Sequence, residues 1–154
     1  MSTWLRHTIW FNRAVLGLAT LLFTSIAVRG LTDPVGSSAA HGITFGSAAG
    51  ITVARVGFGG FPLSFALVFL ACLLSERRLL TGLAALSVTA VVVTSARLLG
   101  LAIDGPAEFT LRVLKPEVVL VVASTAAVFL ERRRRQLEAT PPSPVVPRAA
   151  VRES

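Results

Sequence analysis

This sequence is poor in charge. Charged residues make up 15% of its 154 residues and hydrophobic residues make up 53%, and the mean hydropathy is +0.73. A soluble domain of this size needs a polar surface to cover its core, and this composition leaves too little of one. The scarcity of charge therefore argues against a soluble globular protein and for a membrane protein.

Cysteine and histidine are scarce as well. The single cysteine, Cys72, excludes an intramolecular disulfide, and its place in an apolar run is typical of an inert buried side chain. The two histidines, His7 and His41, lie on opposite membrane sides in the topology derived below, which excludes one haem held by both. The sequence has no phosphate-binding loop, no Ser/His/Asp set and no metal-ligand spacing. We therefore expect no catalytic residues, no cofactor and no metal.

What the sequence does have is long apolar runs. About 20 apolar residues suffice for a helix to cross a hydrocarbon layer of ~30 Å. Four such runs occur, at about residues 9–31, 51–74, 79–103 and 111–130. They predict an all-α fold, an integral membrane four-helix bundle in residues 1–131. Residues 132–154 are basic and then proline-rich, and we expect them to form a cytoplasmic tail that is disordered from Gln136 onward.

The first run also resembles a secretory signal peptide, since Arg6 and Arg13 precede much of its apolar stretch. Against cleavage, the stretch is long for a signal peptide, it ends near Arg29, and it lacks a clean small-x-small site. We therefore expect a retained signal anchor.

The positions of the basic residues predict the orientation. The net charge is +7, and three basic segments lie on one side of a four-span bundle, around residues 6–13, 77–78 and 132–135. The connections on the other side, residues 32–50 and 104–110, contain no Lys or Arg. Because basic residues favour the cytoplasmic side, we expect both termini in the cytoplasm of a multi-pass protein of the cell membrane. The basic run 132–135 then faces anionic lipid head groups rather than nucleic acid.

The longer outer connection is rich in small residues. Gly42, Gly46, Gly50 and Ala54 recur every four residues. On a helix they would form a smooth ridge that lets another backbone approach. A loop of Gly, Ser and Ala explains the same composition, and the sequence leaves both alternatives open.

Several charged residues lie inside the apolar runs. Arg55, Arg97 and Glu117 all fall within about two turns of the outer boundary. A charge at this depth costs roughly 2 to 3 kcal/mol unless it is paired or faces a wet cavity. We therefore predict that Arg97 faces the bundle interior and pairs with Glu117. Asp104, two turns further along the face of Arg97, should contact the same guanidinium or that of Arg55.

The remaining basic residues near this boundary have a simpler interpretation. Arg29, Arg112 and Lys115 have side chains long enough to reach the interface from their helices. We expect them to act as interfacial anchors.

The segment "GFGGFP" follows Arg55 within two residues. Gly57, Gly59 and Gly60 remove side chains where a neighbouring backbone or a ligand comes close, and Pro62 permits a bend. Close helix packing alone and a role in ligand binding are both open.

Three motifs resemble a known family. "ARVGFGG" at 54–60, "ARLLGLAIDGP" at 96–106 and Glu117 early in the last helix resemble the DUF4345 family. Its members are small four-helix membrane proteins of unknown function, similar in outline to the DoxX-like group. The resemblance covers roughly residues 10–131 and implies the four-helix architecture, without implying a reaction.

The resemblance also implies a polar cluster. The family's recurring positions fall here on Arg55, Gly59, Gly60, Arg97, Asp104, Gly105 and Glu117. One departure concerns the acidic residue that the family places two residues after its first arginine, because this chain has Gly57 there. Glu117, Asp104 or Asp33 would then have to serve both arginines.

Two function classes follow. The first is a structural or accessory membrane protein whose charged residues are ion pairs that lock the helices. The alternative is a binder of a lipid, quinone or other amphiphile in an outer-leaflet cavity lined by Arg55, Arg97, Asp104 and Glu117. An enzyme, a transporter and a channel are less favoured, because no catalytic set is present and four helices form no obvious pore without oligomerisation. We expect the lipid bilayer as a partner, with a homo-oligomer or a partner membrane protein as further alternatives.

Overall fold

The computed structural model describes residues 3–39 and 41–139, and this part of the chain is helical without strands. Its elements are α1 (Thr3–Thr32), α2 (Pro34–Ala39), α3 (Ala48–Arg55), the π-helical turn η1 (Val56–Gly60), α4 (Phe61–Leu73), α5 (Leu79–Asp104) and α6 (Glu108–Ala139). Four helices are long and apolar enough to cross a membrane: Trp4–Thr32, Ala48–Leu73, Leu79–Asp104 and Glu108–Ala139. The predicted all-α class and the predicted number of long apolar helices are confirmed.

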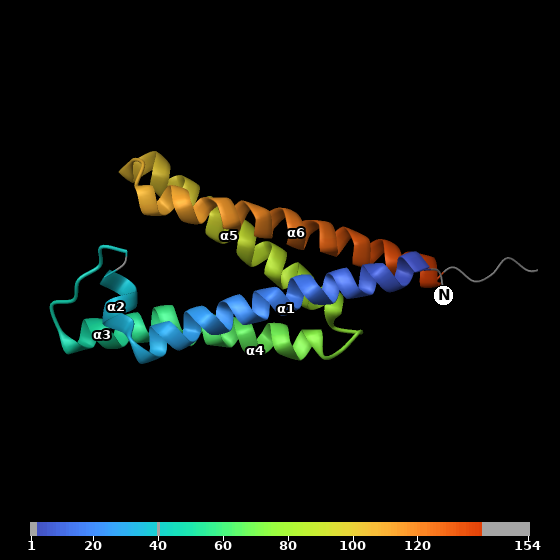
Figure 1. Cartoon of the computed structure of the whole chain (residues 1–154), viewed down its shortest axis with the longest axis horizontal. Helices are drawn as coiled ribbons and strands as arrows, with labels where there is room; N and C mark the ends of the chain where they lie inside the picture. Colours follow the sequence, from blue (N-terminus) through green and yellow to red (C-terminus); the bar gives the residue numbers. More distant parts are fainter. Residues whose placement is uncertain (1–2, 40, 140–154) are drawn as a thin grey trace, which may run out of the picture.

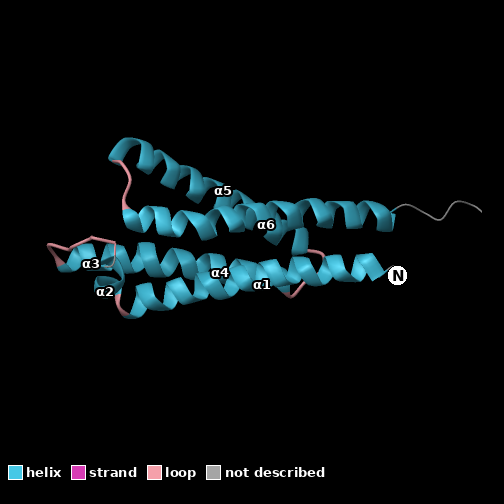
Figure 2. Cartoon of the chain, turned by 45° about the horizontal axis from the view of Figure 1, so that its top comes forward, coloured by secondary structure: helices cyan, strands magenta, loops and turns pink. Residues whose placement is uncertain are grey.

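The long helices associate as two pairs. Helix α1 packs along α4, and α5 packs along α6. The pairs converge where the N-terminal part of α1 meets the C-terminal part of α6, and they splay apart toward α2 and the α5–α6 turn (Figure 1). We name these the Glu131 end and the Asp104 end. Figure 2 shows the same two pairs from a second direction.

The apolar core joins the pairs on the side of the Glu131 end. Its buried members include Leu16, Ala19, Phe69, Leu83 and Ala127. Gly82 of α5 lets that helix approach α4, since a Cβ on Gly82 would lie only 2.6 Å from the Cβ of Cys72. Cys72 itself is buried and free, as expected.

The second membrane-compatible helix is not a regular α-helix throughout. It begins at Ser47, whose hydroxyl caps α3 by accepting a hydrogen bond from the Gly50 nitrogen at 3.2 Å. It then passes through η1 into α4, where the Phe61 nitrogen bonds to the Val56 carbonyl five residues earlier. The helical ridge is not formed, because Gly42 lies in a turn with φ of 75° and Gly46 precedes α3.

The end of the chain corrects one expectation. Helix α6 does not stop before the arginine run but continues through it to Ala139. The expected disorder of residues 136–139 is therefore wrong, and the polar network around Glu131 described below explains why this segment is helical. The rest of the expected tail, residues 140–154, lies outside the described residues.

Candidate functional site

Arg97 and Glu117 form a bidentate ion pair between α5 and α6. Arg97 Nε donates to Glu117 Oε2 and Nη2 donates to Oε1, each at 2.7 Å. The side chains are 25% and 17% exposed. Two parallel hydrogen bonds to a carboxylate are the strongest geometry that a guanidinium offers, and they satisfy both partners in apolar surroundings. The predicted pair is confirmed.

The other two residues of the expected cluster do not join this pair. Arg55 Nε donates to the Leu31 carbonyl of α1 at 3.1 Å, so Arg55 belongs to the opposite helix pair. Asp104 is exposed at the last residue of α5 and makes no side-chain hydrogen bond or ion pair within the described ranges. The expected contact of Asp104 with either arginine is therefore not formed. Because the two pairs splay apart here, Arg55 is separated laterally from Arg97 and Glu117 although it lies at a matching depth.

Asp33 does not serve the arginines either. Its Oδ1 accepts a hydrogen bond from the Gly36 nitrogen at 2.8 Å. The carboxylate thus caps the first turn of the short helix α2, close to a helix start where negative charge is favourable.

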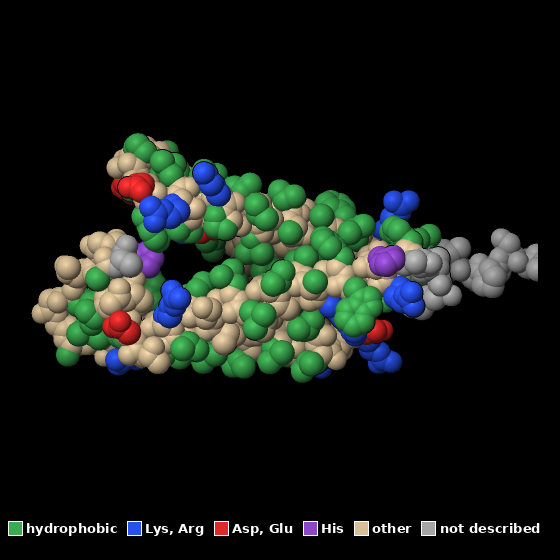
Figure 3. All heavy atoms as spheres, viewed as in Figure 1, with side chains coloured by type: hydrophobic (Ala, Val, Ile, Leu, Met, Phe, Trp, Pro, Cys, Tyr) green, Lys and Arg blue, Asp and Glu red, His purple; other side chains and the backbone are tan. Residues whose placement is uncertain are grey.

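A cavity of about 1020 Å³ lies between the two helix pairs at the Asp104 end. This is at the upper end of the ~300–1,000 Å³ range of small-molecule sites. Figure 3 shows the hollow between the pairs. Most of its walls are apolar, from residues of α1, η1, α4, α5 and α6: Leu22, Phe23, Ile26, Phe58, Pro62, Leu86, Ala90, Val93, Phe109, Val113 and Leu120.

A few polar side chains line the same cavity. Arg97 and Glu117 lie on the wall made by α5 and α6, whereas Arg29 of α1 and Asp33, between α1 and α2, line the opposite wall. Thr94 precedes Arg97 by one turn of α5 and is 8% exposed, and its hydroxyl has no hydrogen-bond partner. The cavity therefore combines a large apolar volume with a small set of convergent polar groups, which is typical of ligand sites.

His41 bridges the two pairs at the Asp104 end of the cavity. Its ring meets Phe109 of α6 edge to face, with ring centroids 4.5 Å apart, and lies parallel to Phe58 of η1 at 6.3 Å. The Nδ1 atom lies 2.6 Å from the Ser37 carbonyl, so Nδ1 carries the proton in this contact. Sequence reasoning considered His41 only as a haem ligand and missed this role.

The glycines near η1 differ in their surroundings. A Cβ on Gly59 would lie 2.7 Å from Leu31 Cγ and 2.9 Å from the Leu31 nitrogen, so this position requires glycine. Gly57 has no atom within 4 Å of such a Cβ, and Gly60 has only Val56 Cγ1 at 4.0 Å. The expected close approach thus holds for Gly59 and not for Gly57 or Gly60. Gly30 of α1 was missed, although a Cβ there would overlap the Phe58 carbonyl.

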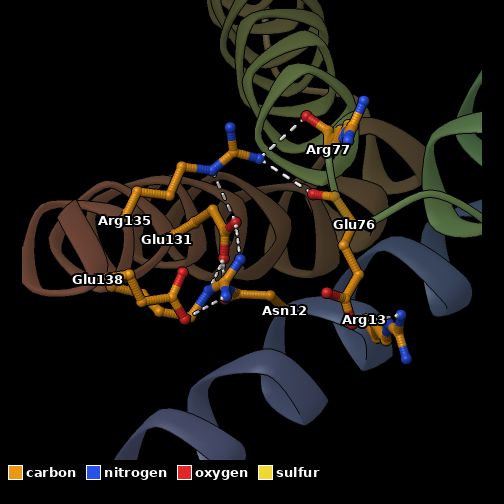
Figure 4. A network of polar contacts seen from close by, with 8 residues as sticks. Asn12, Arg13, Glu76, Arg77, Glu131, Arg135 and Glu138 are labelled. Carbon is orange, nitrogen blue, oxygen red and sulfur yellow. Dashed lines mark hydrogen bonds and ion pairs between the residues drawn. The ribbon is translucent and has the colours of Figure 1, made fainter.

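A second polar network lies at the Glu131 end (Figure 4). Glu131 is fully buried and accepts hydrogen bonds from Arg134 Nε and Nη2, from Arg135 Nε and from Asn12 Nδ2 of α1, at 2.7 to 3.0 Å. Arg134 also bonds to Glu138 at 2.8 Å. Four donors on one carboxylate balance the loss of its hydration. The network links α6 to α1 and thereby holds the two pairs together.

The same network reaches the α4–α5 turn. Arg135 Nη2 donates to the carbonyls of Glu76 and Arg77, each at 3.1 Å, and Arg13 of α1 pairs with Glu76 at 3.2 Å. From the sequence, the arginine run was expected only to flank the membrane, and these roles were not predicted. The available signal was the spacing of Glu131, Arg134 and Arg135, because residues three and four apart meet on one helix face.

No family model, curated protein or solved structure was found to match this chain. The resemblance to the DUF4345 family therefore stays a hypothesis. Among the described residues, no group of three or more His, Cys, Asp or Glu side chains lies close enough together to bind a metal ion.

Proposed function

We propose that this protein is a multi-pass protein of the cell membrane that binds an amphiphile in the cavity between its two helix pairs. The observation that carries the proposal is the cavity itself, about 1020 Å³ of largely apolar volume that includes the Arg97–Glu117 pair. Both termini are cytoplasmic in this proposal, so the Asp104 end lies in the outer leaflet.

Packing supports a binding role over a purely structural one. Protein interiors are close-packed and rarely contain voids much larger than a water molecule. A bundle whose charges served only to lock its helices would gain by closing the splayed end. The pairs are instead joined at the Glu131 end and separated around polar groups at the other. Membrane material must fill the space between them, and the convergent polar groups favour a specific occupant.

A structural role for the ion pair is the second candidate. The bidentate contact joins α5 and α6, which are direct neighbours, and it satisfies both charges without any ligand. In that case the cavity holds ordinary bilayer lipid that exchanges freely.

Variants of two adjacent valines of α5 distinguish the binding function from the purely structural one. Val93 lines the cavity, whereas Val92 is 60% exposed and does not. The protein is purified in mild detergent, and native mass spectrometry measures any bound lipid mass. We expect a defined mass on the wild type and on Val92→Trp, and its loss in Val93→Trp, whose ring occupies part of the cavity. A wild type without a defined bound mass, or equal retention by both variants, would refute the binding function.

A further inference from the structure

We infer that the ligand is an uncharged amphiphile whose hydroxyl or carbonyl group binds at Thr94 and Arg97, with its hydrocarbon against the apolar walls. This inference rests on the proposed function, since it names the class of molecule that the cavity takes. Four observations lead to it: the charge balance of the cavity, the depth of its polar groups, their unused hydrogen-bonding capacity and the position of its opening.

The charges that line the cavity are balanced. Arg97 is paired with Glu117, and the other two charged lining residues, Arg29 and Asp33, are of opposite sign, so the charges of the four sum to zero. A charged head group placed beside Arg97 would meet a guanidinium that Glu117 already neutralises, and it would lose its hydration. An uncharged polar group carries a far smaller desolvation penalty, which one or two hydrogen bonds offset.

The depth of the polar groups excludes a large head group. Arg97 and Thr94 precede Asp104, the last residue of α5, by seven and ten residues. At 1.5 Å per residue these positions lie roughly 10 and 15 Å from the end of the helix. In the proposed orientation this is below the level at which lipid phosphates lie. A hydroxyl or carbonyl group is small enough to reach that depth.

Thr94 has an unused hydroxyl. Threonines elsewhere on these helices bond to the carbonyl four residues earlier, as Thr20 does with Leu16 at 2.9 Å and Thr24 with Thr20 at 2.8 Å. Thr94 makes no such bond, although it is 8% exposed and lines the cavity. Leaving a buried hydroxyl without a partner is unfavourable, so a ligand atom that bonds to it gains affinity.

Arg97, one turn further along α5, offers a second hydrogen-bonding group. Its Nε and Nη2 bind Glu117, whereas Nη1 has no hydrogen-bond partner within the described residues. Thr94 and Arg97 are three residues apart and share one face of α5. A ligand oxygen between them accepts from Nη1, and the threonine hydroxyl donates or accepts as the ligand requires.

The opening of the cavity indicates where the ligand comes from. At the Asp104 end, the contact of His41 with Phe109 joins the two pairs, and the hollow opens sideways between them (Figure 3). In a membrane this side faces lipid. The ligand therefore reaches the cavity from the bilayer rather than from water, as expected of a molecule with long apolar chains and a small polar group.

Lipids with identical chains test the inference. Delipidated protein in detergent is titrated with dioleoylglycerol, which ends in a hydroxyl, and with dioleoylphosphatidate, in which that hydroxyl carries a phosphate. Native mass spectrometry measures the bound fraction of each. We expect dioleoylglycerol to bind at least about tenfold more tightly than dioleoylphosphatidate, because its head group is an uncharged hydroxyl, whereas the head group of dioleoylphosphatidate is an anionic phosphate.

A matched pair of threonine variants tests the binding position. Thr94→Val should weaken dioleoylglycerol binding roughly fivefold to tenfold, the effect of one buried hydrogen bond. Thr20→Val is the control, because Thr20 is also 8% exposed but bonds within its own helix and lies outside the cavity. Its affinity should equal that of the wild type.

The outcomes distinguish the two proposals. Equal or tighter binding of dioleoylphosphatidate, or no effect of Thr94→Val, overturns the inference about the ligand and leaves the binding function standing. A defined endogenous lipid that Val93→Trp does not displace overturns the binding function in this cavity.

Discussion

At the residue scale, the charged side chains of this protein differ chiefly in how well water can reach them. Arg112 and Glu108 form an ion pair of two exposed side chains, 76% and 88% accessible, whereas Arg97 and Glu117 are mostly enclosed. Exposed pairs contribute little to stability because water and salt screen them. Removing one partner of an enclosed pair leaves the other charge without compensation, which is far more costly.

This contrast predicts different effects of two substitutions. Glu117→Ala should lower the free energy of unfolding by about 2 kcal/mol, below the range for fully buried pairs because Arg97 retains some access to water. Arg112→Ala should change it little. Thermal unfolding in detergent measures both.

The double variant Arg97→Leu with Glu117→Leu should regain part of the stability lost in Glu117→Ala, since no charge is left stranded. Ligand binding should stay lost in the double variant, because the donor of Arg97 is gone. Equal destabilisation by Glu117→Ala and Arg112→Ala would contradict the importance of the pair.

At the element scale, the close approach of α1 to η1 depends on two glycines. Gly30 lies against the Phe58 backbone, and Gly59 lies against Leu31. The π-helical turn from Val56 to Gly60 carries Phe58 to the cavity wall. Single π-helical turns occur frequently at functional sites, and here the turn connects helix packing with the shape of the cavity.

Two glycines of this turn make a matched test. Gly59→Ala should destabilise the protein by about 1 to 3 kcal/mol, because its Cβ would lie too close to Leu31. Gly57→Ala should leave the stability unchanged or raise it by up to about 1 kcal/mol, since a Cβ there meets nothing within 4 Å and alanine favours a helix. The midpoints of thermal unfolding of the two variants measure this difference. Equal midpoints would argue against the close packing of Gly59 on Leu31.

At the scale of the whole molecule, the two ends of the bundle differ in how the helix pairs are held. At the Glu131 end, a fully buried carboxylate accepts hydrogen bonds from both helix pairs and fixes them together. At the Asp104 end the pairs diverge around the cavity, and the ring contact of His41 with Phe109 connects them. The hydrogen-bonded end thus joins the two pairs, while the cavity separates them at the other end.

The proposed orientation places the basic Glu131 end in the cytoplasm. Replacing Thr44, in the exposed connection before α3, by cysteine should allow labelling by an impermeant maleimide added outside the cell. Arg78→Cys, in the exposed α4–α5 turn, should react only after the membrane is permeabilised. Cys72 is buried and adds little background. Labelling of Arg78→Cys alone from outside would reverse the topology.

The sequence by itself determined the class of this protein and one of its contacts. Four apolar runs of membrane-spanning length predicted four long helices, because length and hydropathy are local properties of the chain. The pairing of Arg97 with Glu117 was predictable, since two opposite charges at one depth in apolar surroundings are stabilised by forming an ion pair.

The tertiary structure decided which helix faces meet. A helix that is apolar on all sides carries no periodic signal to mark its neighbour. The grouping of α1 with α4 and of α5 with α6, and the cavity between the pairs, therefore appeared only in three dimensions. The same reason explains why Asp104 and Arg55 are absent from the ion pair and why Glu131 is buried. Depth along a helix can be read from its sequence, but direction around its axis depends on the partners that surround it.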